Sequence, residues 1–223
     1  MALDAYSPCP CGSGKKFKWC CQPIHAQIEK AFRQENEGQH EVALRLLDEV
    51  IAEHPTNPEP LGRKAQVLFQ NDRVEDAEQV LEKAFAINPN YAFGHLLRGM
   101  FRQQEGELEG ALSLFRKAAD LYDPEARDIL GQVYTWIAEC EFRLNRPVAS
   151  HAAVKLAIHC DPANTDLRKA TEEMYGEGSV LPASARKDYQ FQSPAASLDP
   201  QRRAGWDRIL QGELAKLTDA ARV

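Results

Sequence analysis

Hydrophobic residues in the middle of the chain recur with a period of 34 residues. Three sets of positions follow this step: Ala43, Ala77 and Ala111; Leu47, Leu81 and Phe115; and Val50, Ala84 and Ala118. Within each unit the apolar residues stand three and four positions apart, which is the spacing of one face of an α-helix. The pattern predicts a tandem repeat in which every unit contributes two helical runs.

Residues that favour turns and helix ends divide these runs at regular places. The predicted turn between the two runs of a unit falls at Gly38, Asp72, Gly106 or Asn145. A proline closes each unit, with small offsets in the last two: Pro55, Pro89, Pro124 and Pro162. Because proline cannot continue a helix, we expect the second helix of each unit to end before it.

These positions resemble the tetratricopeptide repeat (TPR), a pair of antiparallel helices with small residues where the helices cross. The resemblance implies four units, at residues 24–57, 58–91, 92–125 and 131–164. The family's early aromatic residue and Leu-Gly pair are complete in none of them, but small residues keep the close-packing position at Ala31, Ala65, Gly99 and Ala138. We therefore expect an all-α fold, a TPR-like helical-hairpin solenoid over residues 25–164, in preference to a helical bundle with accidental spacing.

The fourth unit departs furthest from the pattern. It requires a five-residue insertion after Pro124, and Ser150 takes the place of its crossing alanine. Its two helices are predicted all the same, because their apolar spacing is retained.

The C-terminal region, residues 165–223, is predicted to hold a helix, an irregular linker and a capping helix. Asn164, Thr165 and Asp166 favour the start of a helix that runs to about Tyr175, and residues 176–197 are rich in Gly, Ser, Pro and Ala. A last helix is predicted from Asp199, with one apolar face formed by Trp206, Ile209, Leu210, Leu214 and Leu217. We interpret it as a cap on the final repeat; the alternative is a helix on a membrane surface, which its mixed charge disfavours.

The candidate chemistry lies near the N-terminus, where residues 9–21 read CPCGSGKKFKWCC. A segment this short cannot bury enough apolar surface to fold alone. Four thiolates around one tetrahedral zinc ion would hold it together and supply folding energy. The spacing therefore predicts a structural zinc site, with no open position for catalysis, formed by Cys9, Cys11, Cys20 and Cys21.

Two alternatives compete with this interpretation. Thiol–disulfide exchange is one of them, because Cys-x-Cys pairs such as Cys9 and Cys11 are known in such reactions, although the adjacent Cys20 and Cys21 would form only a strained disulfide. His25 follows closely enough to replace Cys21 as a ligand, although a position at the start of a helix also explains it. A metal-type spacing shared by four cysteines favours zinc over both.

The same segment resembles the SEC-C motif, the zinc-binding module known from the C-terminus of the translocase ATPase SecA. The family pattern is present in full: Cys9 and Cys11, Gly12-Ser13-Gly14, Lys15-Lys16, Phe17 and Lys18, then Cys20 and Cys21. The resemblance implies Zn²⁺ on the four cysteines of a module spanning residues 1–24. It also implies a protein contact associated with chaperones, secretion or the ribosome. Nothing in the chain resembles the translocase motor, so its ATPase activity is not implied.

Composition places the chain among ordinary globular proteins. It has 223 residues, 43% of them hydrophobic, and a formal net charge of -6. It contains no apolar run of membrane-spanning length and begins without the pattern of a secretory signal, so we expect a cytoplasmic protein with no membrane partner. No nucleotide-binding loop, dinucleotide fingerprint or serine-hydrolase elbow occurs, so we expect no enzymatic activity.

The predicted function is that of a zinc-binding adaptor for protein–protein interaction, with a SEC-C finger on a TPR scaffold. A basic and aromatic surface is expected on the finger from Lys15, Lys16, Phe17, Lys18 and Trp19. A protein partner is also expected along the first helices of the repeats, at Phe32, Gln66, Phe69 and Met100. The alternative function is a nucleic-acid or ribosome-binding module that uses the basic finger. Balancing of thiolate charge by the lysines, and core packing of Phe69 and Met100, are further alternatives.

Overall fold

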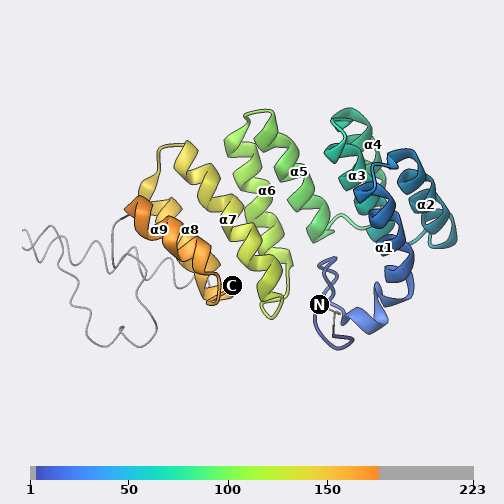
Figure 1. Ribbon diagram of the computed structural model, residues 1–223, viewed down its shortest axis with the longest axis horizontal. Coiled ribbons are helices and arrows are strands. Elements are labelled where there is room, and N and C mark those ends of the chain that lie inside the picture. The colour runs from blue at the N-terminus through green and yellow to red at the C-terminus, as the bar shows by residue number, and fades with distance from the viewer. Residues whose placement is uncertain (1–3, 176–223) are drawn as a thin grey trace, which may run out of the picture. The chain divides into compact units, whose positions relative to one another are not determined.

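Eight helices form four consecutive pairs in the computed structural model, which describes residues 4–175 (Figure 1). The pairs are α1 (Gln22–Asn36) with α2 (His40–Glu53), α3 (Glu59–Gln70) with α4 (Val74–Ile87), α5 (Ala92–Gln104) with α6 (Leu108–Leu121), and α7 (Arg127–Arg143) with α8 (Pro147–Cys160). A short 3-10 helix, η1 (Phe17–Trp19), precedes them, and α9 (Thr165–Tyr175) follows. The linker and capping helix predicted beyond Tyr175 lie outside the described residues.

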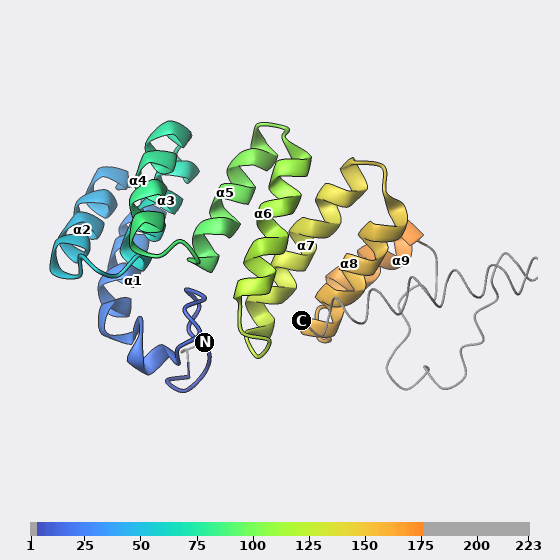
Figure 2. The same ribbon diagram turned by 180° about the vertical axis from the view of Figure 1, so that it is seen from behind.

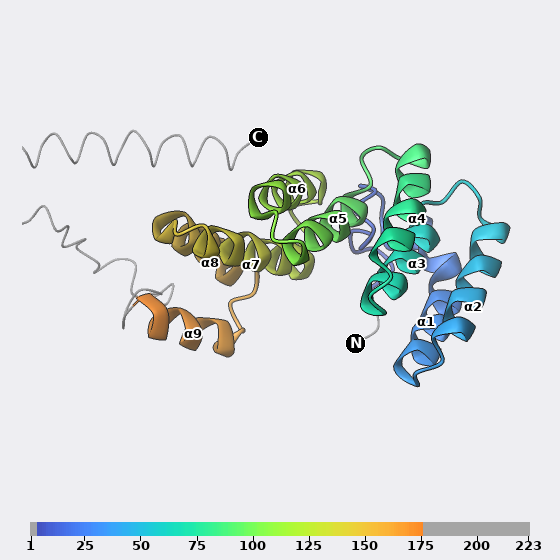
Figure 3. The same cartoon turned by 90° about the horizontal axis from the view of Figure 1, so that it is seen from above.

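The four pairs stand side by side along the chain, as the opposite views of Figures 1 and 2 and the view from above in Figure 3 show. The second and third pairs fall within their predicted repeats and the first begins two residues early, at Gln22, so the all-α TPR solenoid is confirmed. The fourth pair differs in one respect, because α7 begins at Arg127 and not near residue 131. Part of the insertion after Pro124 therefore lengthens α7, which has 17 residues.

The turns within the pairs have the geometry that the sequence predicts. Four residues have left-handed backbone angles: Gly38 (φ 75°), Asp72 (φ 58°), Gly106 (φ 84°) and Asn145 (φ 59°). In the first turn the amide of Gln39 donates to the carbonyl of Gln34 at 2.8 Å, and the amide of Gly38 donates to the carbonyl of Glu35 at 2.9 Å. This pair of bonds is the Schellman motif, and it recurs in the other three turns.

Small side chains lie where the helices of a pair cross. Ala43, Ala77 and Ala111 are fully buried. Ser150 is buried at the equivalent position in the fourth pair, where its hydroxyl donates to the carbonyl of Ala138 at 2.9 Å. Because this bond satisfies the hydroxyl, serine replaces the alanine without leaving a buried polar group unpaired.

The predicted start of α9 is also confirmed. The side-chain oxygen of Asn164 accepts a hydrogen bond from the amide of Leu167 at 2.9 Å, and α9 ends at Tyr175. The bond satisfies one of the amides that a helix start leaves free. None of the helices described is both long and apolar enough to cross a membrane.

Candidate metal centre and interaction surfaces

A short hairpin brings the two cysteine pairs of the N-terminal segment together. Pro8 and Lys16 form an antiparallel bridge, and the amide of Cys9 donates to the carbonyl of Lys15 at 2.9 Å. These bonds return the chain to the start of the hairpin after a turn of only a few residues. We call residues 4–21 the finger.

Two glycines make the turn possible. Gly12 (φ 74°) and Gly14 (φ 72°) both have left-handed backbone angles, which residues with a Cβ rarely adopt. After the turn, η1 leads to Cys20 and Cys21, and α1 begins directly behind them. The second cysteine pair is therefore fixed to the first repeat, while the first pair stands on the hairpin.

The four cysteine sulfur atoms form one group, and all lie within 4.8 Å of one another. The Sγ of Cys11 lies 3.4 Å from that of Cys9 and 3.5 Å from that of Cys20, and the sulfurs of Cys20 and Cys21 are 3.7 Å apart. Four thiolates at 2.3 Å from a central zinc ion would be separated by about 3.8 Å. The donor set and its spacing therefore fit a four-coordinate metal ion, and the expected site residues Cys9, Cys11, Cys20 and Cys21 come together.

The pKa values of the four thiols also favour binding of a cation. The neighbouring Cys11 thiol lowers the pKa of Cys20, whereas it raises the pKa of Cys21. The thiols therefore cannot all ionise at neutral pH by themselves. A divalent cation removes this conflict, because coordinated thiols are deprotonated.

His25 stands apart from the sulfur group. Its ring meets the ring of Phe17 edge-on, with centroids 5.2 Å apart. The candidate metal group among the described residues contains cysteines alone. The edge-on contact supports the interpretation of His25 as a packing residue at the start of α1.

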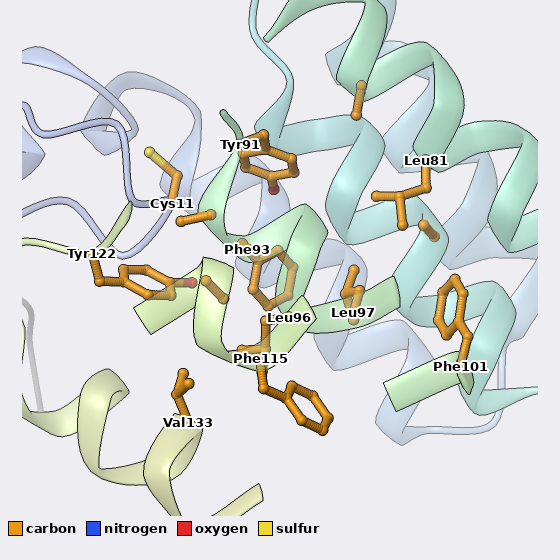
Figure 4. Close-up of a cluster of buried hydrophobic side chains, with 14 of the residues drawn as sticks. Cys11, Leu81, Tyr91, Phe93, Leu96, Leu97, Phe101, Phe115, Tyr122 and Val133 are labelled. Carbon is orange, nitrogen blue, oxygen red and sulfur yellow. The ribbon is translucent and has the colours of Figure 1, made fainter. Parts of the chain in front are cut away.

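The finger packs against helices that are distant in sequence. Gly12 lies so close to the third repeat that an added Cβ would stand 2.2 Å from the Cβ of Ala92 and 3.1 Å from the ring of Tyr122. Figure 4 shows Cys11 beside Tyr91 and Tyr122 in the same cluster of buried side chains. Outside the cluster, the Nζ of Lys16 lies 3.1 Å from Glu125. Cys9, Cys11, Phe17 and Cys21 are thus part of the main hydrophobic core.

A buried polar cluster lies at the base of the finger. The hydroxyl of Tyr91 donates to Glu59 at 2.6 Å, the Nε of Arg63 donates to the same carboxylate at 2.7 Å, and the guanidinium stands 4.0 Å above the ring of Phe93. Burial raises the pKa of Tyr91, and the charge of Glu59 adds to this effect. Burial opposes the charge of Arg63, but Glu59 raises its pKa overall. The groups satisfy one another, as a structural ion pair should.

The expected basic and aromatic surface of the finger is only partly exposed. Lys15, Lys18 and Trp19 face solvent, and the side chain of Trp19 is 65% exposed. Lys16 is paired with Glu125, and Phe17 is only 4% exposed and packs in the core. Phe17 is therefore a correction to the expected surface: its ring packs against His25 at the start of α1 and joins the hydrophobic core.

Tyr6 is a member of this surface that sequence reasoning missed. It is 56% exposed, and its ring meets that of Trp19 edge-on at a centroid distance of 5.8 Å. The Nζ of Lys18 donates to its hydroxyl at 3.2 Å. An aromatic residue just before the first cysteine was the available signal. We call Tyr6, Lys15, Lys18 and Trp19 the aromatic patch.

The predicted groove residues divide into two groups. Phe32 and Gln66 line a hollow of about 310 Å³ that α1 and α3 share with the finger. Phe69 packs against Phe101 with ring centroids 4.6 Å apart, and Met100 is partly buried against the core. The contacts of this second pair match the core-packing alternative.

Comparison with family models finds two matches. The SEC-C motif matches residues 7–23, and the tetratricopeptide repeat matches residues 36–98. Both agree with the resemblances drawn from the sequence. None of the curated proteins compared with the chain matches it.

Solved structures resemble the repeats. The structure of pilF from Pseudomonas aeruginosa aligns with a TM-score of 0.59 and 15% identity over 67% of this chain and 66% of that chain. MamA from Desulfovibrio magneticus aligns with a TM-score of 0.51 and 18% identity over 69% and 84%. A TPR repeat-containing protein from Cytophaga hutchinsonii aligns with a TM-score of 0.51 and 19% identity over 69% of this chain and 62% of that chain. At these identities the likeness shows the fold alone. The chain therefore combines a SEC-C motif with an all-α tetratricopeptide-repeat solenoid.

Proposed function

We propose that this chain is a cytoplasmic, non-enzymatic adaptor that binds other proteins, with a zinc-stabilised finger forming part of its binding surface. The observation that carries the proposal is the hollow shared by the finger and the repeats. Pro10 and Phe17 of the finger face it together with Phe32 on α1 and Gln66 on α3. A polypeptide seated there contacts both modules at once.

The chemistry of the hollow suits a polypeptide segment. Pro10 and Phe32, both partly exposed, supply apolar surface, while Glu29 and Gln66 add polar groups at the same site. Extended peptides present apolar side chains alternating with backbone amides, which such a surface accommodates. TPR solenoids commonly bind peptides along the first helices of their repeats, which here include α1 and α3.

Zinc is the metal we propose for the sulfur group. Four thiolates in a closed tetrahedral set are typical of structural zinc sites. A reducing compartment keeps such thiols free for the metal, which supports a cytoplasmic location. The SEC-C resemblance further suggests a partner associated with chaperones, secretion or the ribosome.

Site-specific photocrosslinking tests the adaptor function. A photoreactive amino acid at Gln66 should capture a partner protein in cells, and the yield should fall when Phe32→Ala alters the hollow. The matched control is the same label at Gln132, which is exposed on α7 away from the hollow. Equal capture from both positions, or none from either, would contradict the proposal.

The aromatic patch favours a second candidate function, binding of single-stranded nucleic acid. An exposed Trp19 beside Tyr6 offers stacking surfaces, and Lys15 and Lys18 offer contacts to phosphate. If this function holds, affinity for an RNA oligonucleotide should fall with Trp19→Ala. It should also fall with rising salt, by roughly 0.7 log units per phosphate contact and log unit of salt. Affinity that does not change with salt rejects it.

A further inference from the structure

The finger lies at the junction between the second and third repeats. It is joined to α1 through Cys21, yet its tip contacts the third repeat, where Gly12 meets Ala92 at the start of α5 and Tyr122 just after α6. Figures 1 and 2 show it beside the ends of these helices. The finger therefore connects two parts of the solenoid that are far apart in sequence.

The finger also borders the second repeat across a hollow. Pro10, Phe17 and Cys21 share a hollow with Glu59 and Arg63, which lie in the first turns of α3. The finger thus packs against Ala92 and Tyr122 and faces α3 across the hollow.

The two ends of the junction are held by different contacts. At the C-terminal ends of α3 and α5, Phe69 packs on Phe101 with ring centroids 4.6 Å apart. Midway along α5, Arg98 reaches Glu78 at 2.8 Å. These contacts involve no residue of the finger.

At the N-terminal ends of α3 and α5, direct contacts also join the two repeats, and the finger packs beside them, with Cys11 next to Tyr91 and Tyr122 (Figure 4). Tyr91 donates to Glu59, and Arg63 covers Phe93. The hydroxyl of Tyr122 is buried here, and no hydrogen-bond partner for it is found among the described residues. Without the finger, this end would expose apolar and aromatic surface that is now covered.

We propose that the metal centre controls how firmly the second and third repeats are held together at the N-terminal ends of α3 and α5. The finger buries little apolar surface of its own, so its shape depends on the ion that joins its four sulfurs. When the ion is lost, the finger loses its shape, its contacts with Ala92 and Tyr122 are released, and this end of the junction loosens. The Phe69–Phe101 end stays closed, so the repeats remain folded and pivot about it.

Hydrogen–deuterium exchange on the full chain, with zinc bound and after removal of zinc by a chelator, tests the proposal. Removal should speed amide exchange by about tenfold in residues 92–97 and 122–126, because local opening exposes these amides. Exchange in α8, which the finger does not touch, should change little. Unchanged exchange in residues 92–97 after zinc removal would overturn the proposal.

A pair of glycine variants separates the effect of the finger's contact with Ala92 and Tyr122 from the effect of metal binding. Gly12→Ala keeps all four thiols but places a methyl group against Ala92 and Tyr122. Gly14 has a similar left-handed φ, and no atom lies within 4 Å of its added Cβ. Gly14→Ala therefore carries the same backbone strain without the contact and serves as the matched control.

With zinc bound to both variants, Gly12→Ala should speed exchange in residues 92–97 by about tenfold and Gly14→Ala should not. The second change Ala92→Gly should restore part of the protection, because it removes the closest contact. Equal effects of the two glycine variants would assign the change to strain within the hairpin. They would contradict the claim that the finger's contact with the third repeat protects residues 92–97. If Gly12→Ala fails to hold zinc, the comparison of zinc-bound and zinc-free wild type decides alone.

Discussion

The finger and the repeats are held together by different means. In the repeats, residues such as Leu47, Leu81 and Phe115 are fully buried at equivalent places in successive pairs, so apolar burial is distributed along the chain. In the finger, Phe17 is the one large apolar side chain fully inside, and the rest of its interior is sulfur. The stability of the repeats is thus divided among many positions, whereas that of the finger is concentrated in one group of four atoms.

The effect of a defect should therefore depend on which region it strikes. A defect in the metal site should remove the whole finger and leave the helices folded. A defect in the repeat core should lower the stability of the helices and leave the metal site occupied under native conditions.

Cys11→Ser should abolish tight metal binding. Structural zinc sites contribute about 10–16 kcal/mol of apparent binding free energy in small zinc-finger peptides, and loss of one thiolate removes much of it. Zinc content of the purified protein should fall from about one ion per chain to near zero. Circular dichroism at 222 nm should change little. The control is Cys160→Ser, which alters a partly buried cysteine outside the sulfur group and should retain the ion.

Loss of most of the helical signal in Cys11→Ser would contradict the division between the two regions. It would mean that the repeats cannot fold without the finger. Retention of a full zinc complement would instead show that the metal is held elsewhere.

Phe115→Ala should lower the free energy of unfolding of the repeats by about 3–5 kcal/mol. Phe115 is fully buried and fills the space over Gly99, where an added Cβ would stand 2.5 Å from its ring. Urea unfolding followed by circular dichroism measures the change. The matched control is Phe142→Ala, because the side chain of Phe142 is 51% exposed and should cost less than about 1 kcal/mol. Similar losses for both would show that burial does not decide the stability.

The repeats were predictable from the sequence because each contact that defines them is local and recurs. Ala43, Ala77 and Ala111 recur at a constant step, and each lies where the two helices of a pair cross. Gly38 and Asn145 each occupy a turn that requires left-handed backbone angles. The sulfur group was predictable for a related reason. All its members lie within one short segment, so their spacing alone restricts how they can meet.

The place of the finger was not predictable in this way. No period or motif links Gly12 to Ala92 or to Tyr122, and each of these residues has an ordinary explanation where it stands. The burial of Phe17 depends on the same docking, so the sequence pointed to a surface residue instead. Packing between modules that are distant in sequence produces no periodic pattern or motif that one sequence can reveal.

The turn residues allow a smaller and sharper test of the local rules. Gly38→Ala should destabilise the first pair by about 1 kcal/mol, because alanine disfavours the left-handed angle and no atom lies within 4 Å of the added Cβ. Gly110→Ala, within α6, should stabilise by up to about 1 kcal/mol, because alanine favours a helix. Chemical denaturation measures both. The same sign for the two substitutions would show that backbone conformation is not their cause.

The smallest expected effect concerns acid, to which the two regions should respond through different groups. In the finger, protons compete with the metal for thiolates. In the repeats, burial lowers the pKa of His95, and the nearby charges of Lys117 and Arg98 act in the same direction, while its hydrogen bond to the carbonyl of Pro89 opposes them. The unfolded chain therefore takes up this proton near pH 6.5, and the folded chain takes it up only at lower pH.

Because the unfolded state binds more protons in that window, the free energy of unfolding should fall as the pH is lowered through about 6.5 toward the folded pKa of His95. Above about pH 6.5 the stabilising effect of the neutral ring is fully present. His95→Gln should retain a donor toward Pro89 and remove the titration, so its stability should depend less on pH than that of the wild type. Both proteins share the metal site, so the difference between their pH profiles cancels the response of the thiolates. Parallel profiles would show that His95 is not the acid-sensitive group of the helices.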